Sequence, residues 1–222
     1  MRAKPHGLVR DFRGANEPDG HPDFETYSGR GASRGIVEDM LGMDKKPVYK
    51  PRGAYRHPDY GQQTTSKERF DEWYRNTDGV NSPVELTLTL TPGANGISTY
   101  DNGEFFPVDG KGFDSETQGH NFHFTFELHT EFIYRGGEIF TFTGDDDLWV
   151  FVNNRLGIDL GGLHPEVSES IDLDEVAEEF GLEVGNTYPL DLFHAERRTN
   201  ASHFRIDSSI QFTNCNPIII PR

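Results

Sequence analysis

Short segments that alternate apolar and polar residues fill the chain from about Ser82 onward, and they restrict its fold more than any other feature. In the clearest segment, residues 121–128, one face carries four apolar side chains: Phe122, Phe124, Phe126 and Leu128. Alternation with period two places successive side chains on opposite faces of a strand. We predict further strands over residues 84–90, 138–143, 148–152, 156–160, 188–194 and 204–212, with a hairpin turn at residues 101–103. Short strands with few helices between them predict an all-β antiparallel β-sandwich.

The first third of the chain has a different pattern, with many turn-forming residues and little alternation. Within it we expect two short helices, over residues 35–42 and 66–75, and the second would place Phe70, Trp73 and Tyr74 against a core. A later helix over residues 174–180 would be capped near Asp172 and ended by Gly181. We therefore predict a single domain, residues 1–222, with a loop-rich cover segment at 1–81 and the sandwich core at 82–214.

The charge balance excludes several classes of partner. The chain has 21 Lys and Arg against 37 Asp and Glu, a net charge of −16. Nucleic acids and anionic membrane surfaces would be repelled by most of such a surface. No apolar run reaches the roughly 20 residues of a membrane helix, and we expect no membrane insertion. Cys215 stands alone, so an internal disulfide is excluded. We find no signal peptide at the start, which leaves a cytosolic protein or part of a longer secreted one.

The most distinctive run of the sequence is residues 143–154, in which Asp145, Asp146 and Asp147 directly precede the apolar segment 148–152. An acidic surface loop is the ordinary explanation of such a triplet. However, a turn at residues 153–154 would return the strand 156–160 antiparallel to this segment. Beside the carboxylates it would set Asp159, Gly161, Gly162 and His164. Glycines there allow close backbone approach. We interpret this corner as a ligand site.

We expect a later part of the chain to bring a further acidic residue to the same region. The predicted strand 188–194 leads into a polar loop that contains Glu196, Arg197 and Arg198. Glu196 is either another carboxylate of the site or the ion-pair partner of Arg197, Arg198 or Arg155. Trp149, on a fully apolar strand, is interpreted as a core residue rather than a platform for sugar stacking.

Together these motifs resemble the fibro-slime domain. This domain is a branch of the carbohydrate-binding superfamily first named for the protective antigen of anthrax toxin, which also includes yeast flocculins and epithelial adhesins. The pairing of Gly-Asp-Asp-Asp-x-Trp-Val-Phe with Asp-Leu-Gly-Gly-x-His is the most specific part of the resemblance. The matching stretches span most of the chain: residues 10–13, 21–25, 105–110, 121–125, 140–153, 158–164 and 193–197.

The resemblance implies a β-sandwich that holds one Ca²⁺ by two adjacent aspartates joined by a cis peptide, and these match Asp145 and Asp146. An asparagine of the relatives' later loop matches Glu196, a carboxylate in place of an amide. Main-chain carbonyls follow as ligands in the relatives, and the corresponding ones are those of Arg198 and Asn200. Oxygen ligands of this kind suit Ca²⁺, which takes roughly 6–8 of them.

The expected function is a calcium-dependent carbohydrate-binding module of an extracellular or cell-surface adhesin, within a larger multi-domain protein. Glycans are the expected partners, and no catalytic nucleophile and base stand out. Residues expected near a bound sugar are Asp147, Gly161, Gly162, His164, Arg197 and Thr199. The alternative is a structural or protein-interaction domain in which Ca²⁺ only stabilises the corner, because a fold alone does not define a function. Asn200 also begins a glycosylation sequon.

Overall fold

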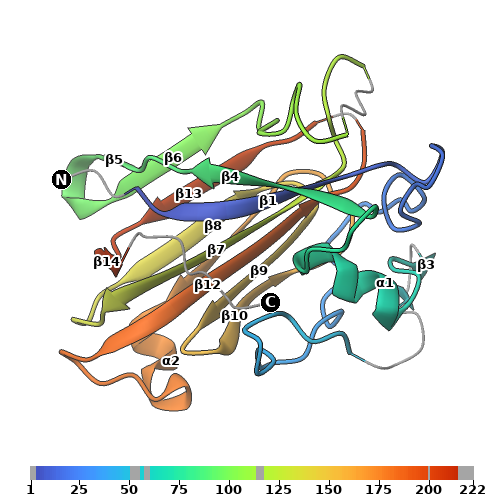
Figure 1. Cartoon of the computed structure of the whole chain (residues 1–222). Coiled ribbons are helices and arrows are strands. Elements are labelled where there is room, and N and C mark those ends of the chain that lie inside the picture. Colours follow the sequence, from blue (N-terminus) through green and yellow to red (C-terminus); the bar gives the residue numbers. More distant parts are fainter. Residues whose placement is uncertain (1–3, 51–55, 58–60, 114–117, 200, 215–222) are drawn as a thin grey trace.

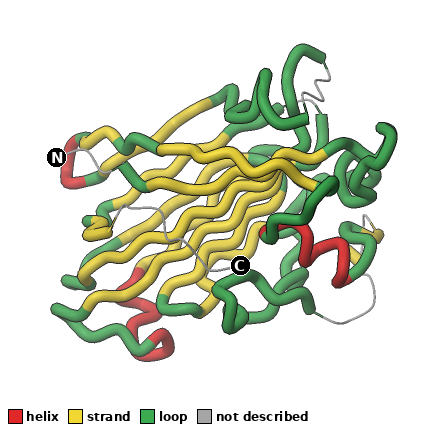
Figure 2. Tube along the Cα trace, viewed as in Figure 1, coloured by secondary structure: helices red, strands yellow, loops and turns green. Residues whose placement is uncertain are grey.

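The computed structural model describes residues 4–50, 56–57, 61–113, 118–199 and 201–214, and it consists mainly of two antiparallel sheets (Figures 1 and 2). The larger sheet has the strand order β10-β9-β12-β7-β1-β4, with β14 also paired to β7, and the smaller has the order β11-β8-β13-β6-β5. The strands of the larger sheet are β1 (His6–Phe12), β4 (Asn81–Thr87), β7 (Phe124–Ile133), β9 (Asp147–Val152), β10 (Arg155–Leu160), β12 (Thr187–Glu196) and β14 (Phe212–Asn214). Those of the smaller sheet are β5 (Thr91–Pro92), β6 (Ser98–Asn102), β8 (Ile139–Gly144), β11 (Val167–Asp172) and β13 (Phe204–Ser208).

The main hydrophobic core lies between the two sheets, where Phe126 and Leu192 of the larger sheet pack with Phe142 and Phe204 of the smaller. Strand β9 is buried on both of its faces. Its even-numbered residues belong to this core, and Trp149 and Phe151 belong to a second cluster on the outer face of the larger sheet. The antiparallel sandwich predicted from the alternation is confirmed, and Trp149 is a core residue.

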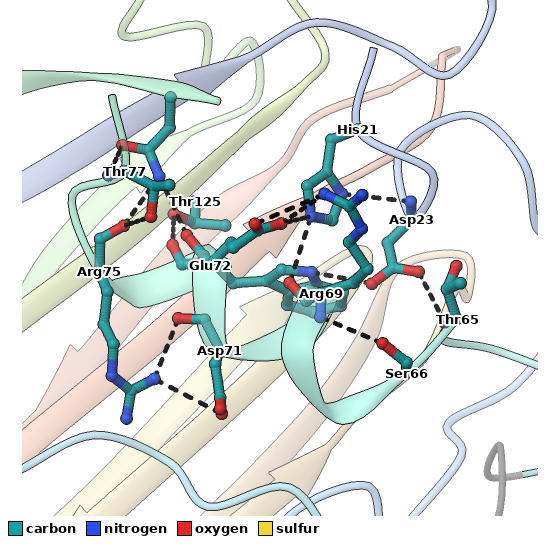
Figure 3. A network of polar contacts seen from close by, with 12 residues as sticks. His21, Asp23, Thr65, Ser66, Arg69, Asp71, Glu72, Arg75, Thr77 and Thr125 are labelled. Carbon is teal, nitrogen blue, oxygen red and sulfur yellow. Dashed lines mark hydrogen bonds and ion pairs between the residues drawn. The ribbon is translucent and has the colours of Figure 1, made fainter. Parts of the chain in front are cut away.

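The outer face of the larger sheet is covered by the N-terminal segment. This segment contains the two-stranded sheet β2 (Arg56–His57) and β3 (Gly61–Gln62), then α1 (Lys67–Asp71) and the 3₁₀-helix η1 (Glu72–Tyr74). Polar contacts hold α1 and η1 in place (Figure 3). Ser66 caps α1 at the amide of Arg69, and the hydroxyl of Thr125 on β7 donates to the carbonyl of Trp73 at 2.6 Å.

Three local predictions differ from the structure. Residues 6–12 form β1, which pairs with β4 and β7 inside the larger sheet, so the segment 1–81 is not only a cover. Residues 35–42 form no helix; isolated bridges join Val37 to Tyr49 and Met40 to Arg155. Residues 101–103 are not a hairpin turn, because β6 pairs with β5 and β13 instead. The edge strand β11 was not predicted, since its sequence is mostly polar.

Two other local predictions are confirmed. Strands β9 and β10 form the expected hairpin, and Asn153 and Asn154 have φ values of 49° and 67°, as a type I′ turn requires. Helix α2 (Leu173–Phe180) begins with the Asp172 side chain bonded to the amide of Asp174 and ends at Gly181 in the left-handed region. No helix among the described residues is long and apolar enough to span a membrane.

Candidate metal and ligand site

Two neighbouring connections between the sheets bring the acidic residues together. Strand β8 of the smaller sheet ends at Gly144 and β9 of the larger begins at Asp147, so Asp145 and Asp146 form the first connection. The second runs from Glu196, the last residue of β12, to Phe204 in β13. Because β12 pairs with β9 and β13 pairs with β8, the two connections must lie side by side. Sheet topology therefore places carboxylates from distant sequence positions at one end of the sandwich.

The first connection bends sharply at Asp146, whose φ is 51°. Aspartate and asparagine tolerate this left-handed region better than most residues. Among the described residues there is no cis peptide bond, so the cis link between Asp145 and Asp146 that the resemblance implied is not present. Because the backbone bends at Asp146 instead, the side chains of Asp145 and Asp146 do not point to strictly opposite sides, as they would on a regular strand.

Each aspartate of the connection is held by the backbone of the other connection. The amide of His203 donates to Asp145 Oδ1 at 2.8 Å, and the amide of Arg197 donates to Asp146 Oδ2 at 2.9 Å. Both aspartates are buried, with 7% and 6% of their surface exposed. Hydrogen bonds from fixed amides orient a carboxylate without neutralising its charge. The two aspartates are thus positioned before any ligand arrives.

Glu196 completes a group of three carboxylates. It is fully buried, and its Oε2 atom has no hydrogen-bond donor among the described residues. Burial, followed by the neighbouring charges of Asp146 and Asp145, raises the pKa of Glu196 well above its usual range. Burial likewise raises the pKa of Asp146. Like charges held together in a buried site that excludes water are unfavourable unless a proton or a cation is shared between them.

No arginine side chain in the described part of the chain pairs with Glu196, so that alternative is not supported. Arg197 instead forms an ion pair with Asp147, at 2.7 Å between Nε and Oδ2, and both side chains are fully buried. Arg198 approaches Glu196 only through its backbone amide, at 3.4 Å. The carboxylate of Glu196 is therefore left facing the two aspartates.

Asp147 and Arg197 differ from their predicted roles as sugar contacts. Asp147 also accepts a hydrogen bond from the amide of Gly162 at 2.6 Å. The guanidinium of Arg197 donates to the carbonyls of Asp23 and Gln63 and lies over the ring of Trp73, 4.6 Å from its centroid. Neither side chain reaches the surface, so the pair acts as an internal brace between β9 and the N-terminal segment.

The loop after β10 lies beside the carboxylates of the site as predicted, but it contacts them through its backbone. The carbonyl of His164 lies 3.4 Å from the amide of Asp146. The ring of His164 forms hydrogen bonds with the carbonyls of Pro165 and Leu160. Gly161 accepts a hydrogen bond from Ser33, and Gly162 has a φ of 88°, which favours glycine.

The remaining predicted residues lie on the second connection. Arg198 is exposed, and its side chain donates to the carbonyl of Tyr27 at 2.6 Å. The amide and hydroxyl of Thr199 donate to the carboxylate of Glu25. Asn200, and with it the predicted carbonyl ligand and the sequon, lies outside the described residues.

Three further residues shape this end of the sandwich, and of these only Glu25 was not predicted to lie there. The carbonyl of Asp145 contacts the buried ring of His194 at 3.3 Å, and burial lowers the pKa of His194 to about 3. His203 holds Asp145 through its amide, while its ring lies between Asp101 and Glu166. Glu25 belongs to a stretch that matched the family motif but carried no chemical signal of its own.

The donor set fits a hard cation, because it consists of carboxylate and carbonyl oxygens. The orphaned Oε2 of Glu196 and the orientation of both aspartates by backbone amides support this. Across the described part of the chain, however, no three His, Cys, Asp or Glu side chains already stand at metal-binding geometry. Backbone oxygens and small side-chain movements would therefore have to complete the coordination.

Comparison with known proteins identifies the family. The model of the PA14 domain matches residues 73–218. The chain belongs to the PA14 domain family. The superfamily predicted from the sequence motifs is thereby confirmed, and the matched region contains all three carboxylates of the site.

Several curated relatives of the chain come from Dictyostelium discoideum. Protein psiR is 39% identical over 212 residues, which cover 89% of this chain and 20% of psiR. Protein psiC is 39% identical over 209 residues, which cover 88% of this chain and 39% of psiC. The chain thus spans well under half the length of either relative.

Solved structures that match the chain include a PA14 sugar-binding domain from an RTX adhesin, with 10% identity, a TM-score of 0.39 and 94% of each chain covered. Another is the epithelial adhesin 6 A domain of Candida glabrata in complex with Galb1-3GlcNAc, with 13% identity, a TM-score of 0.33, and 99% of this chain and 85% of that one covered. At such low scores neither likeness supports a statement about the ligand.

Proposed function

We propose that the chain is a calcium-dependent carbohydrate-binding module of an extracellular or cell-surface protein. One observation carries the proposal: the buried Glu196 lies close enough to Asp146 and Asp145 to be affected by their charges, and its Oε2 atom has no donor among the described residues. A cation is the simplest way to satisfy such a group at neutral pH. The resemblance of the sequence motifs to a carbohydrate-binding superfamily, whose PA14 domain model matches the chain, supports the choice of a glycan as the partner.

The protein's own residues would supply only part of the coordination. Asp145, Asp146 and Glu196 would provide side-chain oxygens, and the carbonyls of Arg198 and Asn200 would provide backbone oxygens. Ca²⁺ bound there would supply an electrostatic contact for neutral hydroxyl oxygens. Because Ca²⁺ takes roughly 6–8 oxygens, positions remain for two vicinal hydroxyls of a sugar. The loops after β10 and β12 would then determine which sugar fits.

A second candidate function is a purely structural calcium site. It is favoured by the burial of the three carboxylates and by their ties to the backbone of both connections. An ion in that position would hold the two connections together even without a sugar. In that case the module would bind a protein partner or serve as a spacer within a longer chain.

Calorimetric titration of the metal-free protein with Ca²⁺ tests the metal site. We expect one ion per chain, and an affinity at least roughly 100-fold weaker in the Asp145→Asn, Asp146→Asn double variant, because two charged ligands become amides. Glu169→Ala, which removes a carboxylate on β11 away from the site, is the matched control and should bind Ca²⁺ as the wild type does. Equal affinity in the double variant and the wild type would refute the site.

A glycan array probed with and without EDTA separates the two candidate functions. The lectin proposal predicts glycan binding that EDTA abolishes and added Ca²⁺ restores. A lower melting temperature in EDTA without any glycan signal would favour the structural role.

A further inference from the structure

Glu25, in the N-terminal segment, contacts the loop that follows β12. Its backbone amide donates to the carbonyl of Arg197 at 2.7 Å. Its carboxylate accepts hydrogen bonds from the hydroxyl and the amide of Thr199, at 2.7 and 3.1 Å. The ring Nε2 of the buried His123 lies 3.2 Å from the same carboxylate. Glu25 thus joins the N-terminal segment, the residue that precedes β7 and the loop after β12.

The backbone of Glu25 is in an unusual conformation, with a φ of 70°. A residue other than glycine keeps such a conformation only where the surroundings enforce it. Here the enforcing contacts include those with three consecutive residues of the loop, because the side chain of Arg198 also donates to the carbonyls of Tyr27 and Glu25, at 2.6 and 3.4 Å.

The same loop also contacts two of the three carboxylates of the site. Its Arg197 amide holds Asp146, and its Arg198 amide contacts Glu196. We propose that Glu25 is a positioning residue of the ligand site, which fixes the loop Arg197–Thr199 in the conformation that presents its backbone to the bound ion. The proposal rests on the calcium site proposed above. It extends that site to a residue outside the region 73–218 that defines the family match.

Hydrogen exchange of the metal-free protein tests the positioning role without any ion. We expect the amides of residues 196–203 to exchange at least about tenfold faster in Glu25→Ala than in the wild type, because the loop loses two hydrogen bonds. Glu25→Gln keeps an acceptor for Thr199 and should largely restore protection. The matched control is Glu169→Ala, which removes a carboxylate that also accepts two hydrogen bonds from the N-terminal segment, from Arg34 at 2.9 and 2.8 Å.

Terbium luminescence tests whether the positioned loop serves the ion. Lifetimes in H₂O and D₂O count the waters on bound Tb³⁺, and we expect Glu25→Ala to add one or more waters and to weaken Ca²⁺ binding by about 10-fold to 100-fold. Unchanged exchange in Glu25→Ala overturns the proposal. Faster exchange with unchanged hydration and affinity also overturns it, because the loop then supplies nothing to the ion. Absence of metal binding in the wild type instead refutes the calcium site, and the assignment of Glu25 to it, whatever the exchange shows.

Discussion

Three consecutive aspartates carry the same side chain and have different surroundings. Asp147 forms an ion pair with the buried guanidinium of Arg197, whereas Asp146, which also lies near that guanidinium, has the carboxylate of Glu196 as a second charged neighbour. Removing one partner of a buried ion pair leaves an uncompensated charge, while removing one of two like charges relieves repulsion. Neighbouring substitutions at these positions should therefore have opposite effects on stability.

We predict that Asp147→Asn lowers the free energy of unfolding by about 3–5 kcal/mol, because Arg197 is left buried and unpaired. Asp146→Asn should raise that of the metal-free protein by about 1 kcal/mol. Asparagine keeps an acceptor for the Arg197 amide and tolerates the positive φ of this position. Urea unfolding in EDTA measures both changes. A shift of the same sign in the two variants would contradict this account of the triplet.

At the scale of elements, the sequence predicted strands best where local pattern and burial agree. Strand β9 was recognisable because every residue from Leu148 to Val152 is apolar, as burial on both faces requires. The turn at Asn153 and Asn154 was recognisable from its chemistry. Glu196 was predicted only as one of two alternatives, a carboxylate of the site or the partner of an arginine, and the family resemblance supplied its match to a ligand position. Its contact with Asp145 could not be read from local sequence, because it depends on which strands pair across some 50 intervening residues.

Strand β1 was missed because its sequence contains charged residues that are nevertheless buried. Arg10 forms an ion pair with Glu127 on β7 at 3.0 Å, and Lys46 of the N-terminal segment contacts the same carboxylate. Asp11 accepts hydrogen bonds from Asn121 and the amide of Phe113. Such pairings join residues far apart in the chain, so no local pattern indicates that these charges lie inside.

The docking of α1 and η1 should depend on pH through His21 (Figure 3). Its Nδ1 accepts from the amide of Asp23 and its Nε2 lies 3.2 Å from the carbonyl of Arg69, an arrangement that suits the neutral ring. Burial lowers the pKa of His21 from 6.5 to about 4, although Glu72 opposes the shift. The contribution of His21 is therefore complete above pH 6.5 and is lost as the pH falls toward 4.

Comparison of the wild type with His21→Gln isolates this contribution. We predict that the variant is less stable at pH 7.5 and that the difference shrinks by about 2–3 kcal/mol between pH 6.5 and 4. Other buried groups, such as Asp11, titrate in both proteins and cancel in the difference. Urea unfolding at half-unit pH steps provides the measurement. A difference that stays constant with pH would show that His21 is not held neutral in the folded state.

At the scale of the whole molecule, the folding unit is larger than the family match. Strand β1 lies between β4 and β7, and Phe12 and Phe24 belong to the same buried cluster as Trp149 and Phe193. The N-terminal segment also contacts the loops after β10 and β12. Gln63 accepts a hydrogen bond from the amide of Leu163, and Glu25 accepts one from the hydroxyl of Thr199. The N-terminal segment therefore contributes to the larger sheet, to the aromatic cluster on the outer face of that sheet and to the ligand site.

A chain that begins at residue 73, where the family match begins, should consequently fail to fold on its own. Loss of β1 leaves β4 and β7 with unpaired edges and exposes the aromatic cluster on the outer face of the larger sheet, which together favour aggregation. We predict that residues 73–222 lack the near-ultraviolet circular dichroism of the full chain and elute as aggregates. Co-expression of residues 1–72 as a separate chain should restore a soluble complex, because the missing strand and cover are supplied in trans. A truncated chain that unfolds cooperatively at the urea midpoint of the full-length protein would mean that the sandwich folds without the N-terminal third.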